Sequence, residues 1–350
     1  MRFSLFCFMI TIHVLPTWAQ NNIPEWSWSG FVDAYYGYDF SKPVSGDRPG
    51  FLYNHTRHNE FNVNLALLRV QAKYDEAYAR VGIMAGTYAQ SNLSAEPATY
   101  QHLYEAYTGI QINAKTSLEV GLFGSHIGWE SAVSKDNWTL SRSLAAENSP
   151  YYLSGVKATY SLSEKWTFAA VVCNGWQRIY RSSKNVTPAM GTQIVYKPSD
   201  RLTINYSTFV GNDKADSTRQ WRYFDNAYAI WLVNPKLGIT TGVDFGAEQK
   251  SKGSSKYNTW LTWAIITRYM LNDMWSVAVR AEQFLDKNQV IVSTGTVHGF
   301  QTLGLSANLD YALTKQSVLR IEGRQLQSRD AIFSGETSNL SVLSSLAISF

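Results

Sequence analysis

Charged side chains alternate with uncharged ones near the C-terminus of this chain. Arg320, Glu322 and Arg324 are separated by Ile321 and Gly323. Successive side chains of a β-strand point to opposite faces, so a strand would place all three charges on one face. A face with both signs of charge can orient charged solutes, and the same charges can instead pair with one another. The pattern predicts a charged, wet surface built on a strand.

Other segments repeat this arrangement on their polar faces. The residues expected on the same wet surface are Arg69, Gln71, Arg80, Glu105, Glu119, Lys157, Asp244, Arg268, Arg280, Glu282, Arg320, Glu322 and Arg324. Basic residues outnumber acidic ones in this set, which predicts a mild preference for anions. The net charge of the whole chain is only +4, and no run of Lys and Arg indicates binding of nucleic acid.

The histidines give little sign of catalytic or metal chemistry. His55 and His58 have a spacing that can ligate a metal, but no Cys or carboxylate cluster accompanies them, so surface histidines explain the pattern better. His102, His126 and His298 lie at strand–loop junctions, where an enzyme built on a barrel rim would need one. The chain has no Gly-x-Ser-x-Gly motif and no Gly-rich phosphate loop. We therefore predict no catalytic residue, no metal and no cofactor.

Residues 126–150 form the longest interval without alternation. Large apolar side chains lie among its charges; the charged residues are Glu130, Lys135, Asp136, Arg142 and Glu147, and the apolar ones include Trp129, Trp138 and Leu140. Two explanations stay open. The interval can fold back inside the protein and narrow its interior space, or it can be an ordinary exposed loop. We favour a constriction loop, because Trp138 and Leu140 need a dry surface to pack against.

The N-terminus indicates export. A positive residue precedes an apolar stretch at residues 3–15, and residues 17–19 (TWA) offer a small-residue cleavage pattern, so residues 1–19 are predicted to be a signal peptide. The stretch is too short to span a bilayer as a helix, and no later stretch is apolar for long enough. Cleavage would remove Cys7 and leave Cys173 without a partner for an internal disulfide.

The rest of the chain alternates with a period of two. We expect about sixteen strands of roughly 9–11 residues, the length that crosses a bilayer at a tilt. The segments 61–74 and 77–88 are joined by the turn Asp75-Glu76, which would place Gln71 opposite Arg80. Every second connection is short and every other one is long. This predicts an all-β, antiparallel up-and-down barrel over residues 20–350, with short periplasmic turns and long extracellular loops.

Composition and aromatic positions favour a membrane over water. Only 17% of residues are charged and 14% are aromatic, whereas about a quarter are charged in soluble proteins. Along residues 257–271 the odd positions have an apolar centre with aromatic residues on either side, as in a strand with both ends at membrane interfaces. A soluble secreted β-protein is the alternative, but its strands would be shorter and its loops would have no reason to alternate in length.

Four short blocks, in order, resemble the OmpL-like family of outer-membrane porins. They are residues 126–130 (HIGWE), 137–143 (NWTLSRS), 151–160 (YYLSGVKATY) and 174–176 (NGW). Residues 145–148 (AAEN) depart from the family's more apolar, Gly- or Pro-rich pattern. The resemblance implies passive or weakly selective transport. The last strand, which ends at Phe350, resembles the signal that bacterial barrel-assembly machinery recognises.

A barrel of about sixteen strands is too wide for side chains to fill, which predicts an aqueous channel. The main expectation is therefore a porin of the bacterial outer membrane, and not an enzyme. It would pass small hydrophilic solutes, contact lipid and lipopolysaccharide, and assemble as a homotrimer. A saccharide-selective channel is the first alternative, since tryptophans near loop ends can stack on sugar rings, namely Trp129, Trp138, Trp176 and Trp221. A barrel enzyme is the second.

Overall fold

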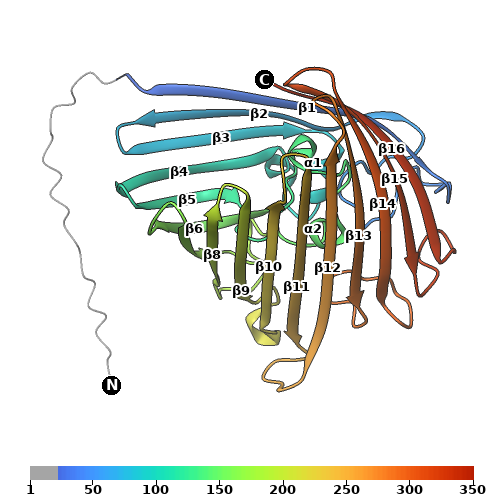
Figure 1. The fold of residues 1–350 in the computed structure, drawn as a ribbon. Coiled ribbons are helices and arrows are strands. Elements are labelled where there is room, and N and C mark those ends of the chain that lie inside the picture. The colour runs from blue at the N-terminus through green and yellow to red at the C-terminus, as the bar shows by residue number, and fades with distance from the viewer. Residues whose placement is uncertain (1–22) are drawn as a thin grey trace, which may run out of the picture.

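Sixteen β-strands follow one another along residues 23–350, the part of the chain that the computed structural model describes (Figure 1). Each strand pairs antiparallel with its sequence neighbours, and β1 pairs with β16, so the sheet closes into a barrel. The predicted all-β up-and-down barrel is confirmed. The predicted signal peptide, residues 1–19, lies outside the described residues.

The strands are 8 to 15 residues long, so several are longer than the predicted 9–11 residues. In chain order they are β1 (Glu25–Asp39), β2 (Phe61–Tyr74), β3 (Ala77–Ala85), β4 (Leu103–Asn113), β5 (Thr116–Gly124), β6 (Tyr152–Ser161), β7 (Trp166–Cys173), β8 (Ala189–Ser199), β9 (Leu202–Gly211), β10 (Arg222–Leu232), β11 (Leu237–Gln249), β12 (Tyr257–Met270), β13 (Trp275–Asp286), β14 (Phe300–Ala312), β15 (Ser317–Ser328) and β16 (Ser338–Ser349). Two short helices, α1 (Thr87–Asn92) and α2 (Leu144–Glu147), and three 3₁₀ turns, Ala98–Tyr100, Ser134–Asp136 and Asp216–Thr218, lie between strands.

The connections alternate in length, as predicted. Short turns join β2 to β3 and every second pair after it at one end of the barrel. The long connections at the other end are named L1 (40–60), L2 (86–102), L3 (125–151), L4 (174–188), L5 (212–221), L6 (250–256), L7 (287–299) and L8 (329–337). Within residues 23–350, neither helix is long and apolar enough to cross a lipid bilayer.

The register of the first hairpin also follows the polarity pattern. Gln71 lies opposite Arg80, as predicted, and the Arg80 Nε donates to the Gln71 Oε1 at 2.9 Å. The neighbouring pairs Val70–Val81 and Ala72–Ala79 share the opposite face. A slip of one residue would turn Arg80 toward the outside of the barrel, so the pairing is strongly specified.

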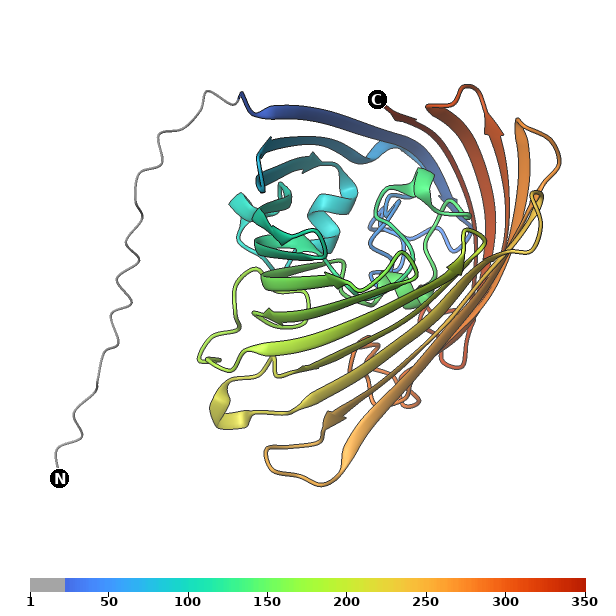
Figure 2. The ribbon, with the colours of Figure 1, turned by 60° about the vertical axis from the view of Figure 1, so that its left-hand side comes forward.

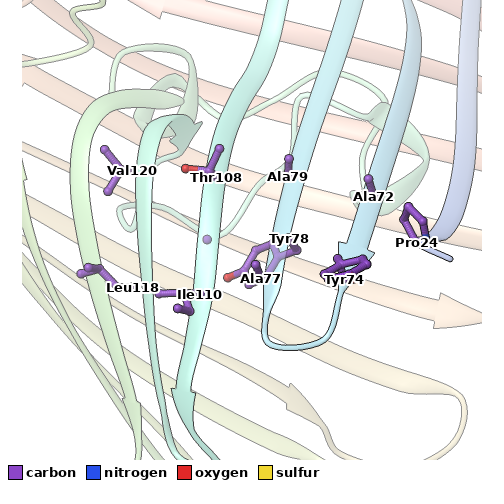
Figure 3. Close-up of a pocket in the computed structure, with 11 residues that line it drawn as sticks. Pro24, Ala72, Tyr74, Ala77, Tyr78, Ala79, Thr108, Ile110, Leu118 and Val120 are labelled. Carbon is purple, nitrogen blue, oxygen red and sulfur yellow. The ribbon is translucent and has the colours of Figure 1, made fainter. Parts of the chain in front are cut away.

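The outer surface is apolar along the strands. On β12, Leu261 and Ile265 are exposed, whereas Trp260 and Ala264 point inward and are buried. Between β2 and β5 the outer surface is hollowed by small side chains such as Ala77, and the hollow holds about 500 Å³ (Figure 3). An outer face of this kind suits lipid and would promote aggregation in water.

Replacing Leu305 with Arg is expected to destabilise the folded barrel. Leu305 lies near the middle of β14 with 55% of its side chain exposed outward, and an Arg facing lipid at mid-membrane costs about 2–4 kcal/mol. Urea unfolding in lipid vesicles measures the difference. Thr159→Arg is the matched control, because Thr159 shares the inner face of β6 with Lys157; an equal loss in both variants would contradict the assignment of faces.

The inside of the barrel is occupied by folded loops. Figure 2 shows α1 and L3 within the ring of strands. Helix α1 packs on β2 and β3, where Tyr88 and Leu93 join a buried cluster with Leu65, Met84 and Val133 of L3. A second apolar cluster lies at the long-loop end of the barrel. The structure therefore differs from an open tube.

Candidate functional site

L3 crosses the barrel interior from its origin after β5. The His126 Nε2 donates to the carbonyl oxygen of Thr208 at 2.9 Å, and burial lowers the pKa of the imidazole. The backbone N–H of Gly128 donates to the Asn226 Oδ1 at 3.2 Å. Next, the Trp129 ring lies over Gly242, where any side chain would overlap it. The first part of L3 is thus fixed to β9, β10 and β11.

The middle of L3 reaches the short-turn end of the barrel. The Lys135 Nζ donates to the Ser349 Oγ at 2.7 Å and to the carbonyl oxygen of Lys315 at 3.1 Å, in the turn between β14 and β15. The Ser134 Oγ donates to the Asp33 Oδ2 of β1 at 2.8 Å. L3 therefore spans the interior from one end to the other.

Arg280 of β13 anchors the returning part of L3. Its guanidinium donates to the Thr139 Oγ1 at 2.9 Å, and to the Ser141 carbonyl oxygen at 2.6 Å and Oγ at 2.9 Å. It also pairs with Glu282 at 3.1 Å and with Glu322 at 3.0 Å. Both carboxylates in turn accept from the loop backbone, Glu322 from Ser141 at 2.5 Å and Glu282 from Leu144 at 2.6 Å.

Arg320 and Arg324 of β15 extend this anchor. Arg320 pairs with Asp310 at 2.7 Å and donates to the carbonyl oxygen of Ser134 at 2.5 Å. Arg324 pairs with Glu282 at 2.7 Å. All three arginines of this wall are buried, so their charges are neutralised by neighbours and do not face water. The alternating charges first noted in the sequence hold L3 against β13–β15.

The end of L3 is held by a buried ion pair. The Arg142 Nη2 lies 3.0 Å from the Glu147 Oε2, and both side chains are at most 2% exposed. Glu147 also accepts from the backbone N–H of Tyr53 in L1 at 2.8 Å. The Arg142 guanidinium stacks 3.5 Å over the ring of Tyr151 and 5.2 Å from that of Tyr88. This pair joins L1, L2 and L3.

The five residues predicted for the constriction do not meet at one place. Glu130 accepts from the Ser143 backbone at 3.0 Å, and burial raises the pKa of its carboxyl. Arg142 and Glu147 form the buried pair. Burial lowers the pKa of Arg142, but the nearby Glu147 carboxylate raises it, and the pKa ends above its usual value. Lys135 is half-buried and Asp136 is exposed; these two lie at the short-turn end.

A wetter wall lies on β2–β6. Arg69 pairs with Glu105 at 3.3 Å, and Lys157 pairs with Glu119 at 2.6 Å. The Arg69 side chain is 32% exposed, whereas that of Arg280 is fully buried. Arg80 is half-buried and has Gln71 rather than a carboxylate as its partner. Arg268 of β12, also half-buried, faces a cavity of about 200 Å³ beside Lys135, Asp310 and Arg320 at the short-turn end.

An apolar ring at the long-loop end was not predicted. Inward-pointing residues of the strands meet apolar residues of L1, L3, L7 and L8; they include Phe51, Phe123, Leu144, Val171, Phe209, Phe224, Trp260, Phe284, Val292, Phe300, Leu326 and Phe333. The rings of Phe51 and Phe300 are 4.7 Å apart, for example. In the sequence, this ring is indicated by aromatic residues at lumen-facing positions next to a long loop, such as Phe209 and Phe284.

The tryptophans considered for sugar stacking are packed on protein groups. Trp129 lies over Gly242 and 5.8 Å from the Tyr228 ring, and Trp138 lies over Gly238. Trp176 stands edge-on to Phe224 at 4.8 Å and borders a cavity at the long-loop end.

The comparisons with known proteins agree with this geometry. A protein-family model described as "Putative beta-barrel porin-2, OmpL-like" matches residues 25–350. A comparison with curated protein sequences finds no match.

Several solved porins and channels share the fold. The anion-selective porin from Comamonas acidovorans has a TM-score of 0.64 at 9% identity, covering 94% of this chain and all of that one. The outer-membrane channel DcaP of Acinetobacter baumannii has a TM-score of 0.63 at 11% identity, covering 93% and 97%. OmpF of Salmonella typhi, in complex with daunomycin, has a TM-score of 0.61 at 10% identity, covering 93% and 98%.

Identities this low show a shared fold alone, so the family match carries the assignment. It spans almost all of the described barrel, and it agrees with the resemblance seen in the four short blocks. The chain belongs to the OmpL-like beta-barrel porin-2 family, and it is a porin-like channel of the bacterial outer membrane.

Proposed function

We propose that the protein passes small hydrophilic solutes by passive diffusion, with a mild preference for anions. The observation that carries the proposal is the contrast between the two walls of the barrel. Buried ion pairs hold L3 against β13–β15, whereas Arg69, Arg80 and Lys157 on β2–β6 are partly exposed. A wall that is wet and basic is the side along which solutes would move.

L3 is the proposed constriction in this scheme. Arg142 and Glu147 are buried and Glu130 is half-buried, and all three would act by holding the loop inside the barrel. Lys135 and Asp136 are more accessible and would meet solutes at the short-turn end. We also propose that the barrel-assembly machinery recognises the last strand together with the following Phe350, which is 72% exposed. We further propose that the protein forms homotrimers and contacts lipopolysaccharide.

Single-channel recording in a planar bilayer tests the proposal directly. The purified protein is expected to give discrete current steps in KCl. Protein shown to be folded by heat-modifiable migration on a gel, yet giving no current at any voltage, would contradict passive diffusion. Sedimentation in detergent tests the trimer separately.

The double variant Arg80→Gln/Lys157→Gln is expected to lose most of the anion preference. Both cations lie on the wet wall, and removal of Lys157 leaves Glu119 without its ion pair. The reversal potential in a KCl gradient should shift toward cation selectivity. Arg201→Gln/Lys236→Gln removes the same charge from exposed short turns and should change little. Equal shifts of the reversal potential in the two double variants would contradict the assignment of the wet wall.

A further inference from the structure

A cavity of about 310 Å³ opens among the long loops, outside the apolar ring. Its walls come from the loops L1, L2, L3, L4, L5 and L7 and from the start of β10. The polar and aromatic side chains that matter here are Tyr53, Glu147, Trp176, Arg178, Asp213 and Arg222, with Lys214 at the rim. We call this cavity the outer vestibule. Its volume corresponds to roughly ten water molecules, at about 30 Å³ each.

The carboxylates around the outer vestibule are already engaged. Asp213 pairs with Arg222 at 3.0 Å and accepts from the backbone N–H of Trp176 at 3.1 Å. Glu147 pairs with Arg142. Glu96, on L2, accepts from the backbone N–H groups of residues 179 and 180 at 2.8 and 3.2 Å.

Two cations that line the same space have no such partner. Within residues 23–350, neither the Arg178 guanidinium nor the Lys214 ammonium forms an ion pair or a side-chain hydrogen bond. Arg178 is half-buried in L4 and Lys214 is exposed in L5. A guanidinium offers five N–H donors and an ammonium three, so the outer vestibule presents charged donors without acceptors. Such donors match the oxygens of a carboxylate or phosphate.

Trp176 gives the outer vestibule a rigid apolar surface. Its ring is edge-on to Phe209 at 5.1 Å and to Phe224 at 4.8 Å, and the Arg222 guanidinium lies 5.3 Å away. Arg222 is itself fixed by Glu248 at 2.6 Å. Because these contacts hold the indole in place, little side-chain entropy is lost when a flat or apolar group packs against it.

We propose that the outer vestibule binds small organic anions before they permeate. Arg178 and Lys214 hold the anionic oxygens, and the apolar body of the solute packs beside Trp176. This inference rests on the proposed porin function and adds a substrate class to it. Aromatic and other apolar carboxylates are the favoured class, because they use both the cations and the indole.

Isothermal titration of the refolded full chain in lipopolysaccharide-free detergent tests the site. Benzoate, acetate, inorganic phosphate and glucose serve as probes. We expect benzoate to bind most tightly, acetate and phosphate more weakly, and glucose not at all. The double variant Arg178→Ala/Lys214→Ala should lower benzoate affinity at least about ten-fold, the loss of roughly 1.4 kcal/mol of charge-assisted hydrogen bonding.

The control variant Lys250→Ala/Lys256→Ala removes the same charge from L6, outside the lining of the vestibule. It should bind benzoate as the native chain does. Equal loss in both variants, or equal binding of glucose and benzoate, would overturn the proposal. Binding of added lipopolysaccharide without binding of benzoate or phosphate would overturn it too, since the cations would then serve a lipid headgroup. Benzoate binding without any channel current would refute only the porin function, and current without binding would refute only the vestibule site.

Discussion

Arg280→Ala is expected to free L3 from the wall and raise the single-channel conductance several-fold. The substitution removes the bonds to Thr139 and Ser141 and leaves Glu282 and Glu322 short of a buried positive partner. Breaking a buried ion pair in this way costs about 3–5 kcal/mol. At 1.36 kcal/mol for each factor of ten, the docked state of L3 becomes roughly a hundred-fold or more less favoured.

Planar-bilayer recording and limited trypsin digestion measure this release together. Larger current steps should accompany new cleavage after Lys135 or Arg142, because both residues belong to L3 and lie inside the barrel while it is docked. Arg268→Ala is the matched control. Arg268 lies on the adjacent strand β12, and its only hydrogen-bond partner in the described chain is Ser276 at 3.3 Å, so L3 should stay docked. Native conductance together with native protection in Arg280→Ala would refute the anchoring role.

Glu147→Ala is expected to be the most destabilising single change in the loops. It leaves the Arg142 charge buried without its carboxylate, at a cost of about 3–5 kcal/mol, and it removes the acceptor of the Tyr53 N–H. Urea unfolding in detergent, followed by loss of heat-modifiable migration, gives the change in free energy of unfolding.

The double variant Arg142→Met/Glu147→Leu should recover much of that loss, because it removes both buried charges and keeps similar volume. Glu60→Ala serves as the comparison, since the Glu60–Arg57 pair is exposed and should contribute little. A double variant as unstable as Glu147→Ala would show that the pair matters through packing or backbone hydrogen bonds instead of charge.

The strand pattern was predictable from the sequence because it is a local property. Residues two positions apart share a face, so the alternation around Gln71 and Arg80 gave their pairing, and turn residues such as Asp75 and Glu76 gave the connection. The odd residues of 257–271 face outward for the same reason. Each of these predictions depends on a few neighbouring residues.

The interior was harder to predict, because it depends on contacts between distant residues. Arg280 and Arg320 were expected on a wet wall, and they do point inward, but Ser134, Ser141 and other L3 groups cover them. The alternation shows the face of a side chain and not what lies against it. Aromatic residues on the lumen face, such as Phe284, depart from the polar pattern because they pack against apolar residues of L1 and L7.

The tip of L3 lies across the seam where the first and last strands meet. Ser134 bonds to Asp33 of β1 and Lys135 to Ser349 of β16, over separations of 101 and 214 residues. Both bonds reach strands that pair with each other at the seam. We expect L3 to dock after this pairing forms, because the β1–β16 contact closes the longest stretch of chain in the described barrel. The same contacts reinforce the closed seam from inside, so L3 helps to hold together the barrel that encloses it.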